Sequence, residues 1–357
     1  MLALLVAFFV AAVVTPLVRG VATHLGVVDR PDGGRKTHHR PTALLGGVAL
    51  FVALAITIVI AVYAGWLPGL HIKEKYLLGI LIAALLLVIG GALDDRFDLP
   101  PLRQIIWPIL AAAVIVTSGV GIAYVTNPLG GQLHLDRFSV TVLWWQGIPY
   151  HFTFLADVFA FLWLLSMTYT TKLLDGLDGL VSGVTAIGAI IIAFVSITRD
   201  VAQPDTAILA LIVAGIFLGF LLSNFQPATI FLGEGGSTLA GFLLGTLAII
   251  SGGKIATTML VFGLPLFDAA FVILRRLVWE RRSPTSADRS HLHFRLLDLG
   301  FSPRQVVLFY YFIAAMFGVS TFVLQGWEKL IAIGMLASII VIATAVAMIV
   351  FKKRLRS

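Results

Sequence analysis

The sequence contains no cysteine and little charge. Without cysteine, disulfide bonds, cysteine-ligated zinc sites and iron–sulfur clusters are excluded. Charged residues make up 12% of the 357 residues and hydrophobic residues 59%, whereas a soluble domain has about 25% charged residues. The mean hydropathy is +1.01. The composition therefore excludes an ordinary soluble domain and predicts an integral membrane protein.

Basic residues exceed acidic ones, which gives a net charge of +7. In a membrane protein such an excess more often anchors cytoplasmic loops than binds nucleic acid. No nucleic-acid-binding motif is visible, so we expect no nucleic-acid partner. The first apolar run, residues 2–18, lacks the basic start and small-residue cleavage site of a signal peptide, so we expect it to be retained as a span.

Apolar runs long enough to cross a bilayer recur along the whole chain. We count eleven, at residues 2–18, 44–64, 76–93, 105–125, 154–171, 180–197, 206–222, 237–251, 255–272, 306–324 and 329–350. They lack the alternation of barrel strands, so the sequence predicts an all-α polytopic membrane protein with a single domain, residues 1–357. The interruption at 251–254 is either a tight turn or a break inside one longer element.

The basic residues indicate the orientation of these spans. Nineteen of the 25 lysines and arginines follow odd-numbered spans, and such residues stay cytoplasmic. We therefore expect the N-terminus outside and the C-terminus in the cytoplasm. The cytoplasmic loops expected to carry the chemistry are 19–43, 94–104, 172–180, 223–236 and 273–305. The longest external loop, 120–153, is expected to form a hairpin or a short cap.

Adjacent carboxylates end the third span. Asp94 and Asp95 repel each other and lie at the negative pole of the helix dipole. Such a pair usually needs a cation or a proton to be tolerated. The alternative is a solvated helix end that Arg96 and Arg103 neutralise.

Two further acidic segments fall on the same side of the predicted topology. Asp175 and Asp178 are three residues apart, so they share one face of a helical turn, and glycines beside them allow other backbone to approach. Glu234, ten residues after Asn224, lies in a glycine-rich turn that opens the eighth span. Backbone N–H groups at such a helix start suit a phosphate.

A loop rich in histidine and arginine completes the set on this side. His291 and His293 lie near Arg289 and Arg295, a combination suited to holding phosphates, although isolated histidines are more often surface decoration. A site there would offer carboxylates for Mg²⁺ or Mn²⁺, amides and arginines for phosphates, and an apolar flank for lipid. That set suits transfer of a phosphate-linked group between a soluble nucleotide and a lipid carrier.

These segments, in this order, resemble the polyprenyl-phosphate N-acetylhexosamine-1-phosphate transferases. The resemblance covers nearly the whole chain and rests on 29–31, 35–38, Pro41, Gly46-Gly47, Asp94-Asp95, the 175–180 run DGLDGL, 224–237, Pro265 to Asp268 with Arg275-Arg276, and 291–300. The last segment is more similar to the branch that uses UDP-GlcNAc than to the phospho-MurNAc-pentapeptide transferases.

The resemblance implies a glycosyltransferase of the bacterial inner membrane, with its active site facing the cytoplasm. It would transfer GlcNAc-1-phosphate from a UDP-N-acetylhexosamine to undecaprenyl phosphate, with Mg²⁺ as cofactor, for cell-envelope polysaccharides such as lipopolysaccharide or teichoic acid. A homodimer is implied as well, although no span shows a helix-pairing motif. The implied residues are Asp94, Asp95, Asp175 and Asp178 for catalysis, Lys172, Asn224, Gly233, Ser237, His291, His293, Arg289 and Arg295 for the substrates, and Glu234 and Asp178 for the metal.

The chain departs from the family pattern at three places. Lys172 replaces an asparagine, Glu234 and Gly235 replace an aspartate and a serine or threonine, and Phe294 replaces a histidine. The Lys172 ammonium could pair with the carboxylates, take the place of the cation or contact phosphate. The departures leave open an altered or weakened activity, or a non-catalytic family member. A membrane transporter is the other alternative, although it would need acids near the bilayer midplane.

Overall fold

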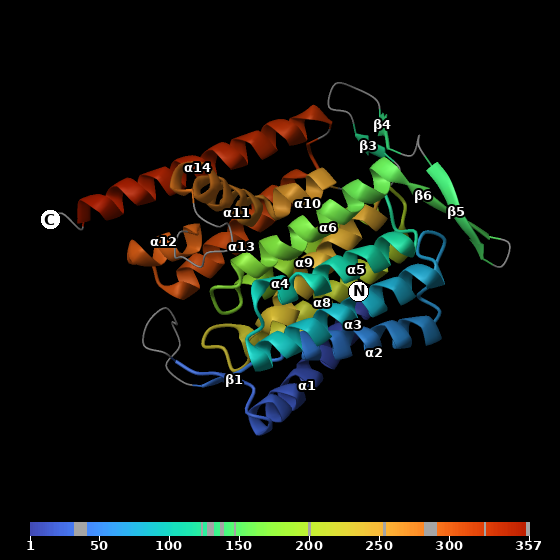
Figure 1. Cartoon of the computed structure of the whole chain (residues 1–357), viewed down its shortest axis with the longest axis horizontal. Helices are drawn as coiled ribbons and strands as arrows, with labels where there is room; N and C mark the ends of the chain where they lie inside the picture. Colours follow the sequence, from blue (N-terminus) through green and yellow to red (C-terminus); the bar gives the residue numbers. More distant parts are fainter. Residues whose placement is uncertain are drawn as a thin grey trace.

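The structure is a computed structural model that describes residues 1–31, 41–122, 124–126, 132–135, 139–145, 148–198, 201–252, 255–281, 291–324 and 326–354. Its helices are α1 (Leu2–His24), α2 (Gly46–Tyr63), α3 (Glu74–Phe97), α4 (Pro101–Gln104), α5 (Ile106–Thr117), α6 (Phe154–Leu174), α7 (Leu180–Ser196), α8 (Pro204–Asn224), α9 (Gly233–Ile250), α10 (Ile255–Val261), α11 (Gly263–Leu274), the π-helix η1 (Arg275–Glu280), α12 (Leu292–Asp298), α13 (Pro303–Ser320) and α14 (Trp327–Arg354). The long helices run side by side as one bundle (Figure 1).

The strands in the described residues form three small antiparallel pairs. They are β1 (Val28–Asp29) with β2 (Thr42–Ala43), β3 (Tyr124–Thr126) with β4 (Gln132–His134), and β5 (Ser139–Trp145) with β6 (Ile148–Thr153). The last two pairs confirm the hairpin expected in the loop 120–153. They lie at one end of the bundle, whereas β1, α4 and α12 lie toward the other (Figure 1).

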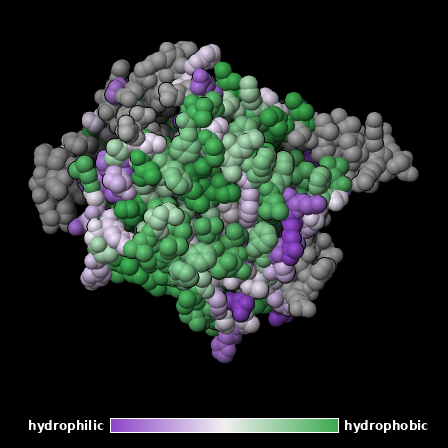
Figure 2. Space-filling model, turned by 180° about the vertical axis from the view of Figure 1, so that it is seen from behind, coloured by the Kyte–Doolittle hydropathy of each residue, from purple (hydrophilic) through white to green (hydrophobic). Residues whose placement is uncertain are grey.

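The helices bury small side chains and expose large apolar ones, the reverse of a soluble protein. In α1, Ala7 and Ala11 are buried while Phe9 and Val13 are exposed. The alanine face packs on α8, where Gly215 and Gly219 admit the α1 backbone. Figure 2 shows a broadly apolar outer face. Only an apolar solvent stabilises such a surface, so the protein is integral to a membrane.

Six described helices are long and apolar enough to cross a membrane: α1, α2, α3, α6, α8 and α9. The pair α10 and α11 would make a seventh, but it is bent by 82°. The span predicted over 255–272 therefore contains a break after Val261, and its crossing of the membrane stays a prediction. Gly263 and Pro265 lie just after the break, where proline cannot donate a backbone hydrogen bond. The count of eleven spans, the orientation of the termini and the single domain 1–357 stay predictions.

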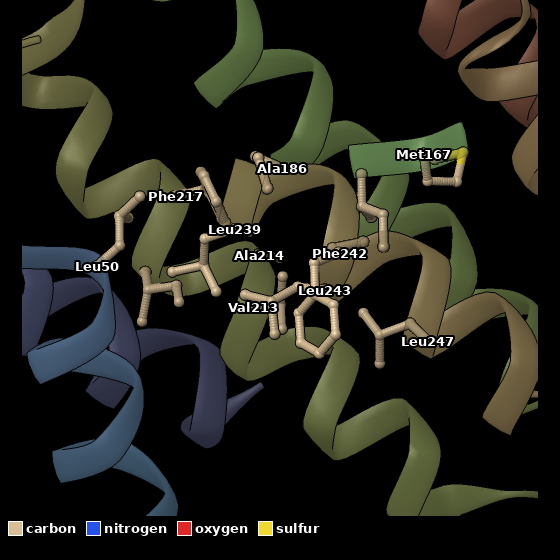
Figure 3. Packing of buried hydrophobic residues seen from close by; sticks show 14 of the residues in the cluster. Leu50, Met167, Ala186, Val213, Ala214, Phe217, Leu239, Phe242, Leu243 and Leu247 are labelled. Atoms are coloured by element: carbon tan, nitrogen blue, oxygen red, sulfur yellow. The ribbon is translucent and has the colours of Figure 1, made fainter. Parts of the chain in front are cut away.

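Helix α9 is the centre of the bundle. It packs against α2, α3, α6, α7, α8 and α10. Its residues Leu239, Phe242 and Leu243 are buried, and Figure 3 shows them among side chains of the neighbouring helices. The position of its first turn is therefore set by the helices around it.

Paired glycines let the neighbouring helices reach the start of α9. A side chain at Gly91 of α3 would collide with the backbone of Gly235, and one at Gly47 of α2 would lie 2.5 Å from the backbone nitrogen of Gly236. The end of α3 and the start of α2 consequently pack backbone to backbone on the first turn of α9.

We expect Gly91→Ala to lower the free energy of unfolding by about 1–3 kcal/mol, because the added methyl group must push α3 away from α9. Thermal unfolding of the purified protein in detergent measures the effect. Gly20→Ala is the matched control, since a methyl group at Gly20 of α1 meets nothing within 4 Å. Equal unfolding temperatures for the two variants would contradict the close packing of α3 on α9.

Candidate functional site

The predicted acidic segments meet at one end of the bundle. Helices α3, α6 and α8 end there, and α7 and α9 begin there. Asp94 and Asp95 lie in the last turn of α3, Asp175 directly follows α6, and Glu234 lies in the first turn of α9. Asp175 is close enough to interact electrostatically with Glu234, Asp95 and Asp178. We call these five carboxylates the acidic cluster.

Asp95 joins α3 to α9. Its Oδ1 accepts a hydrogen bond of 3.0 Å from the backbone N–H of Glu234. Gly233, the residue before Glu234, has a φ of +67°, which favours glycine. Any side chain at Gly233 would also collide with the Asp95 carboxylate. A carboxylate at a helix N-terminus also complements the helix dipole. The Asp95 carboxylate is thus fixed against the start of α9.

Asp94 is held by the segment that follows its own helix. Its Oδ1 accepts hydrogen bonds of 2.9 Å from the backbone N–H of Leu99 and from Nε2 of Gln104. Helix α3 ends here because Asp98 adopts a left-handed conformation and two prolines follow. The turn brings Gln104 of α4 back to the carboxylate.

Lys172 of α6 bonds directly to the acidic cluster. Its Nζ lies 2.5 Å from Oε1 of Glu234 and 2.8 Å from Oε1 of Gln104. The two charged side chains are 22% and 17% exposed, so solvent screens this ion pair only in part. The ammonium therefore neutralises one member of the cluster.

Asp175 and Asp178 lie in the loop between α6 and α7. Asp178 Oδ2 accepts a hydrogen bond of 2.9 Å from the backbone N–H of Ala228. Burial of the Asp175 carboxyl group, followed by the negative charges of Glu234, Asp95 and Asp178, raises the pKa of Asp175 to about 8. The Asp175 side chain is in contact with solvent. Water therefore reduces the effect of burial on its pKa, whereas the neighbouring negative charges act at short range. Negative charge is crowded here and favours binding of a cation.

The donor set suits Mg²⁺, but not as a closed cage. Within the described ranges, no group of three or more His, Asp and Glu side chains is arranged to hold a metal ion. Mg²⁺ is usually held by one or two carboxylates together with substrate phosphates and water. The oxygens of the acidic cluster fit that kind of shared site.

Asn224 and Ser237 support the loop between α8 and α9. Asn224 Nδ2 donates to the carbonyl of Ile230 at 3.0 Å, and its Oδ1 accepts from Ser182 Oγ at 2.7 Å. Ser237 Oγ donates to the carbonyl of Gly233 at 2.9 Å. Both side chains are buried. Their bonds position the start of α9, and the substrate-binding roles of Asn224, Gly233 and Ser237 stay predictions.

The histidine motif packs against the loop that carries Asp175. His291 and His293 are buried, with ring centroids 5.7 Å apart and planes nearly parallel. A side chain at Gly176 would lie 2.6 Å from Nε2 of His293. Arg295 lies in α12, and Arg289 and residues 32–40 lie outside the described residues. The structure thus brings His293 to the edge of the acidic cluster.

Two polar residues near these groups were not among the predicted site residues. Asp268 of α11 holds the histidine motif, because its Oδ2 lies 2.9 Å from Nδ1 of His291 and its Oδ1 accepts from the N–H of Leu292 at 3.0 Å. Gln104 links Asp94 to Lys172. The sequence signal for Asp268 is an acidic side chain within an apolar run, whereas Gln104 lies in the loop 94–104 that was expected to carry the chemistry.

A cavity of about 220 Å³ lies at the opposite end of the bundle. His71, Gln203 and Gly252 contribute to its lining. Nearby, Asp205 of α8 accepts backbone hydrogen bonds from His71 at 2.6 Å and Ile72 at 2.7 Å. None of the predicted site residues that the structure describes lies at this end.

Comparisons with known proteins find a family model and several similar proteins. Residues 77–252 match the family model described as glycosyl transferase family 4. The chain is 31% identical to a probable undecaprenyl-phosphate N-acetylglucosaminyl 1-phosphate transferase of Bacillus subtilis, over 91% of this chain and 86% of that protein.

Two further relatives carry related names. A decaprenyl-phosphate N-acetylglucosaminephosphotransferase of Mycolicibacterium smegmatis is 31% identical over 94% of this chain and 85% of that protein. An undecaprenyl-phosphate alpha-N-acetylglucosaminyl 1-phosphate transferase of Escherichia coli is 28% identical over 80% and 73%.

Burial of His293 gives a prediction for stability against pH. Burial, followed by the neighbouring His291, lowers the pKa of His293 to about 3, whereas a histidine in an unfolded chain has a pKa of about 6.5. As the pH falls below about 6.5, the unfolded chain binds a proton that the folded chain does not bind until about pH 3. Stability is therefore lost as the pH falls through this window. We expect His293→Leu to lose less stability than the wild type between pH 7 and pH 5.

Thermal unfolding in detergent at the two pH values measures this difference. His24→Leu, which removes an exposed histidine at the end of α1, is the matched control and should keep the wild-type pH dependence. The same loss for His293→Leu and the wild type would show that His293 does not contribute.

Proposed function

Because the chain belongs to glycosyl transferase family 4, we propose that it transfers N-acetylglucosamine-1-phosphate from UDP-GlcNAc to undecaprenyl phosphate. The products are lipid-diphosphate-GlcNAc and UMP. The observation that carries this function is the meeting of five carboxylates and the histidine motif at one end of an apolar bundle. A soluble nucleotide can reach that end from water while the prenyl chain stays in the bilayer.

The reaction exchanges one bond at phosphorus for another. An oxygen of the lipid phosphate attacks the β-phosphorus of UDP-GlcNAc, and the bond from that phosphorus to the bridging oxygen breaks as UMP leaves. No proton has to be removed from the nucleophile, because a phosphate monoester is already largely ionised near neutral pH. The task of the protein is to bring two anions together and to stabilise the charge between them.

Asp94 and Asp95 are better suited to positioning than to proton abstraction. Each carboxylate already accepts hydrogen bonds, Asp94 from Leu99 and Gln104 and Asp95 from the start of α9. The lipid phosphate needs no base, and a carboxylate held by such bonds has a fixed position from which it can order other groups. We therefore assign both residues to ordering the groups around the lipid phosphate.

The nucleotide side is assigned to Asp175, Asp178, Lys172, His291, His293, Arg289 and Arg295. Glu234 and Asp178 would hold Mg²⁺, or Mn²⁺, together with phosphates of the donor. When bound, such an ion supplies positive charge to the diphosphate. Asp268 keeps His291 oriented toward this region through the bond to its Nδ1.

We place the acidic cluster on the cytoplasmic side of the bacterial inner membrane. The placement rests on the excess of lysine and arginine in the loops on that side. The cluster lies at a bundle end rather than at the midplane, which argues against a transporter. A homodimer and the polymer made from the product stay predictions.

The phospho-MurNAc-pentapeptide transferases remain the alternative donor class. The names of the relatives favour GlcNAc, and the segment 291–300 favours it independently. A non-catalytic protein is favoured by one observation, the pairing of Lys172 with Glu234. A donor screen separates all three functions.

We expect the purified protein to release UMP from UDP-GlcNAc in the presence of Mg²⁺ and undecaprenyl phosphate. Asp94→Asn and Asp95→Asn should each lower the rate by about a hundredfold or more, because the lipid phosphate loses its fixed surroundings. Chromatographic detection of UMP measures the rate.

Glu74→Gln is the matched control, since it removes an exposed carboxylate from the opposite end of α3, and it should keep the wild-type rate. Release of UMP from UDP-MurNAc-pentapeptide but not from UDP-GlcNAc would move the protein to the alternative class. No release from any UDP-sugar would favour a non-catalytic role.

A further inference from the structure

Lys172 is fixed at three points. Its ammonium bonds to Glu234 Oε1 and to Gln104 Oε1, and it lies 5.7 Å from the centre of the Tyr169 ring one turn earlier in α6. Each contact is one that an ammonium prefers: a carboxylate, an amide oxygen and an aromatic face. In the absence of a nucleotide, these contacts keep the ammonium beside Glu234.

Gln104 determines how the ammonium is held. Its Nε2 donates both to Asp94 Oδ1 at 2.9 Å and to the carbonyl of Leu99 at 2.8 Å. The amide nitrogen is thereby committed, so the amide oxygen turns toward Lys172. A continuous chain of bonds then runs from Asp94 through Gln104 and Lys172 to Glu234. It connects the ends of α3 and α6 with the start of α9.

The ammonium of Lys172 occupies Glu234 Oε1, an oxygen that could otherwise bind a metal ion. A divalent cation can use Glu234 Oε1 only after the ammonium moves away, and the ammonium would then lose its strongest partner. Two cations beside one carboxylate would also repel each other. Lys172 and a divalent cation therefore compete for Glu234.

We propose that the Lys172 ammonium is a built-in cation of the acidic cluster, which weakens divalent metal binding at Glu234 and offers positive charge to the diphosphate of a nucleotide. The second part rests on the function proposed above. A diphosphate brought to five carboxylates meets repulsion, and an ammonium on a flexible four-carbon stem can turn from Glu234 to a phosphate oxygen. The diphosphate then needs less positive charge from a metal ion.

Metal binding tests the first part without any turnover. Mn²⁺ affinity of the full-length protein in detergent is measured by the loss of the free-ion signal in electron paramagnetic resonance. We expect Lys172→Met to bind Mn²⁺ about tenfold or more tightly than the wild type, because the competitor is gone. In a Glu234→Gln background the same substitution should give no gain. Lys172→Arg should resemble the wild type.

Lys75→Met is the matched control for loss of one positive charge. Lys75 lies in the first turn of α3, some 20 residues before the acidic cluster and thus about 30 Å away along the helix. Its Mn²⁺ affinity should equal that of the wild type. Lys172→Asn serves if Lys172→Met does not fold, since the shorter polar side chain removes the charge and should also tighten Mn²⁺ binding.

Nucleotide binding without metal tests the second part. UDP is titrated into the protein in the presence of EDTA and followed by calorimetry. We expect the wild type and Lys172→Arg to bind UDP, and Lys172→Met to bind it about tenfold more weakly.

The outcomes separate the two proposals. Unchanged or weaker Mn²⁺ binding by Lys172→Met and Lys172→Asn would overturn competition at Glu234 and leave a purely structural ion pair. Equal UDP binding by Lys172→Met and the wild type would overturn the contact with the diphosphate. If the wild type releases no UMP while Lys172→Met still binds Mn²⁺ more tightly than the wild type, the proposed function is overturned and competition at Glu234 stands.

Discussion

Negative charge held at the end of an apolar bundle is the constraint on which the rest of this structure depends. Carboxylates next to lipid are stable only when hydrogen bonds or positive charge compensate them. Asp95 is compensated by the first turn of α9, Asp94 by Gln104 and the N–H of Leu99, and Glu234 by Lys172. Each of these bonds joins different helices or a helix to its following loop. The same contacts therefore compensate the negative charges and hold the helices together.

The glycines explain how such contacts form at all. The Asp95 carboxylate reaches the N–H of Glu234 only because α3 approaches α9 at the distance that Gly91 and Gly235 allow, and because Gly233 leaves space for the carboxylate itself. At the opposite end of α8, Asp205 accepts two backbone hydrogen bonds from the segment before α3. Helix α3, which carries Asp94 and Asp95, is thus held at both ends.

The sequence was sufficient to predict the features that depend on local pattern. Runs of apolar residues located the helices, and glycine and acidic motifs located the segments that meet at the cluster, because each motif directly follows or precedes a helix. The bend after Val261 was not predicted, since its cause is a glycine and a proline inside an otherwise apolar run that hydropathy alone treats as continuous. The partners of Lys172 and His291 were also missed. Gln104 and Asp268 lie 68 and 23 residues away from them, and only the packing of the helices brings them together.

Two of the departures from the family pattern lie 62 residues apart in the sequence. The family pattern has an asparagine where this chain has Lys172 and an aspartate where it has Glu234. In the structure these side chains bond to each other, and the length of the glutamate is what brings its carboxylate to the ammonium. An aspartate at 234 would hold its carboxylate about 1 Å or more further back, beyond good hydrogen-bonding distance. Conversely, Glu234 without Lys172 would add an uncompensated charge to four other carboxylates. The two departures therefore act as a pair, because the bonded side chains together alter how positive charge reaches the acidic cluster.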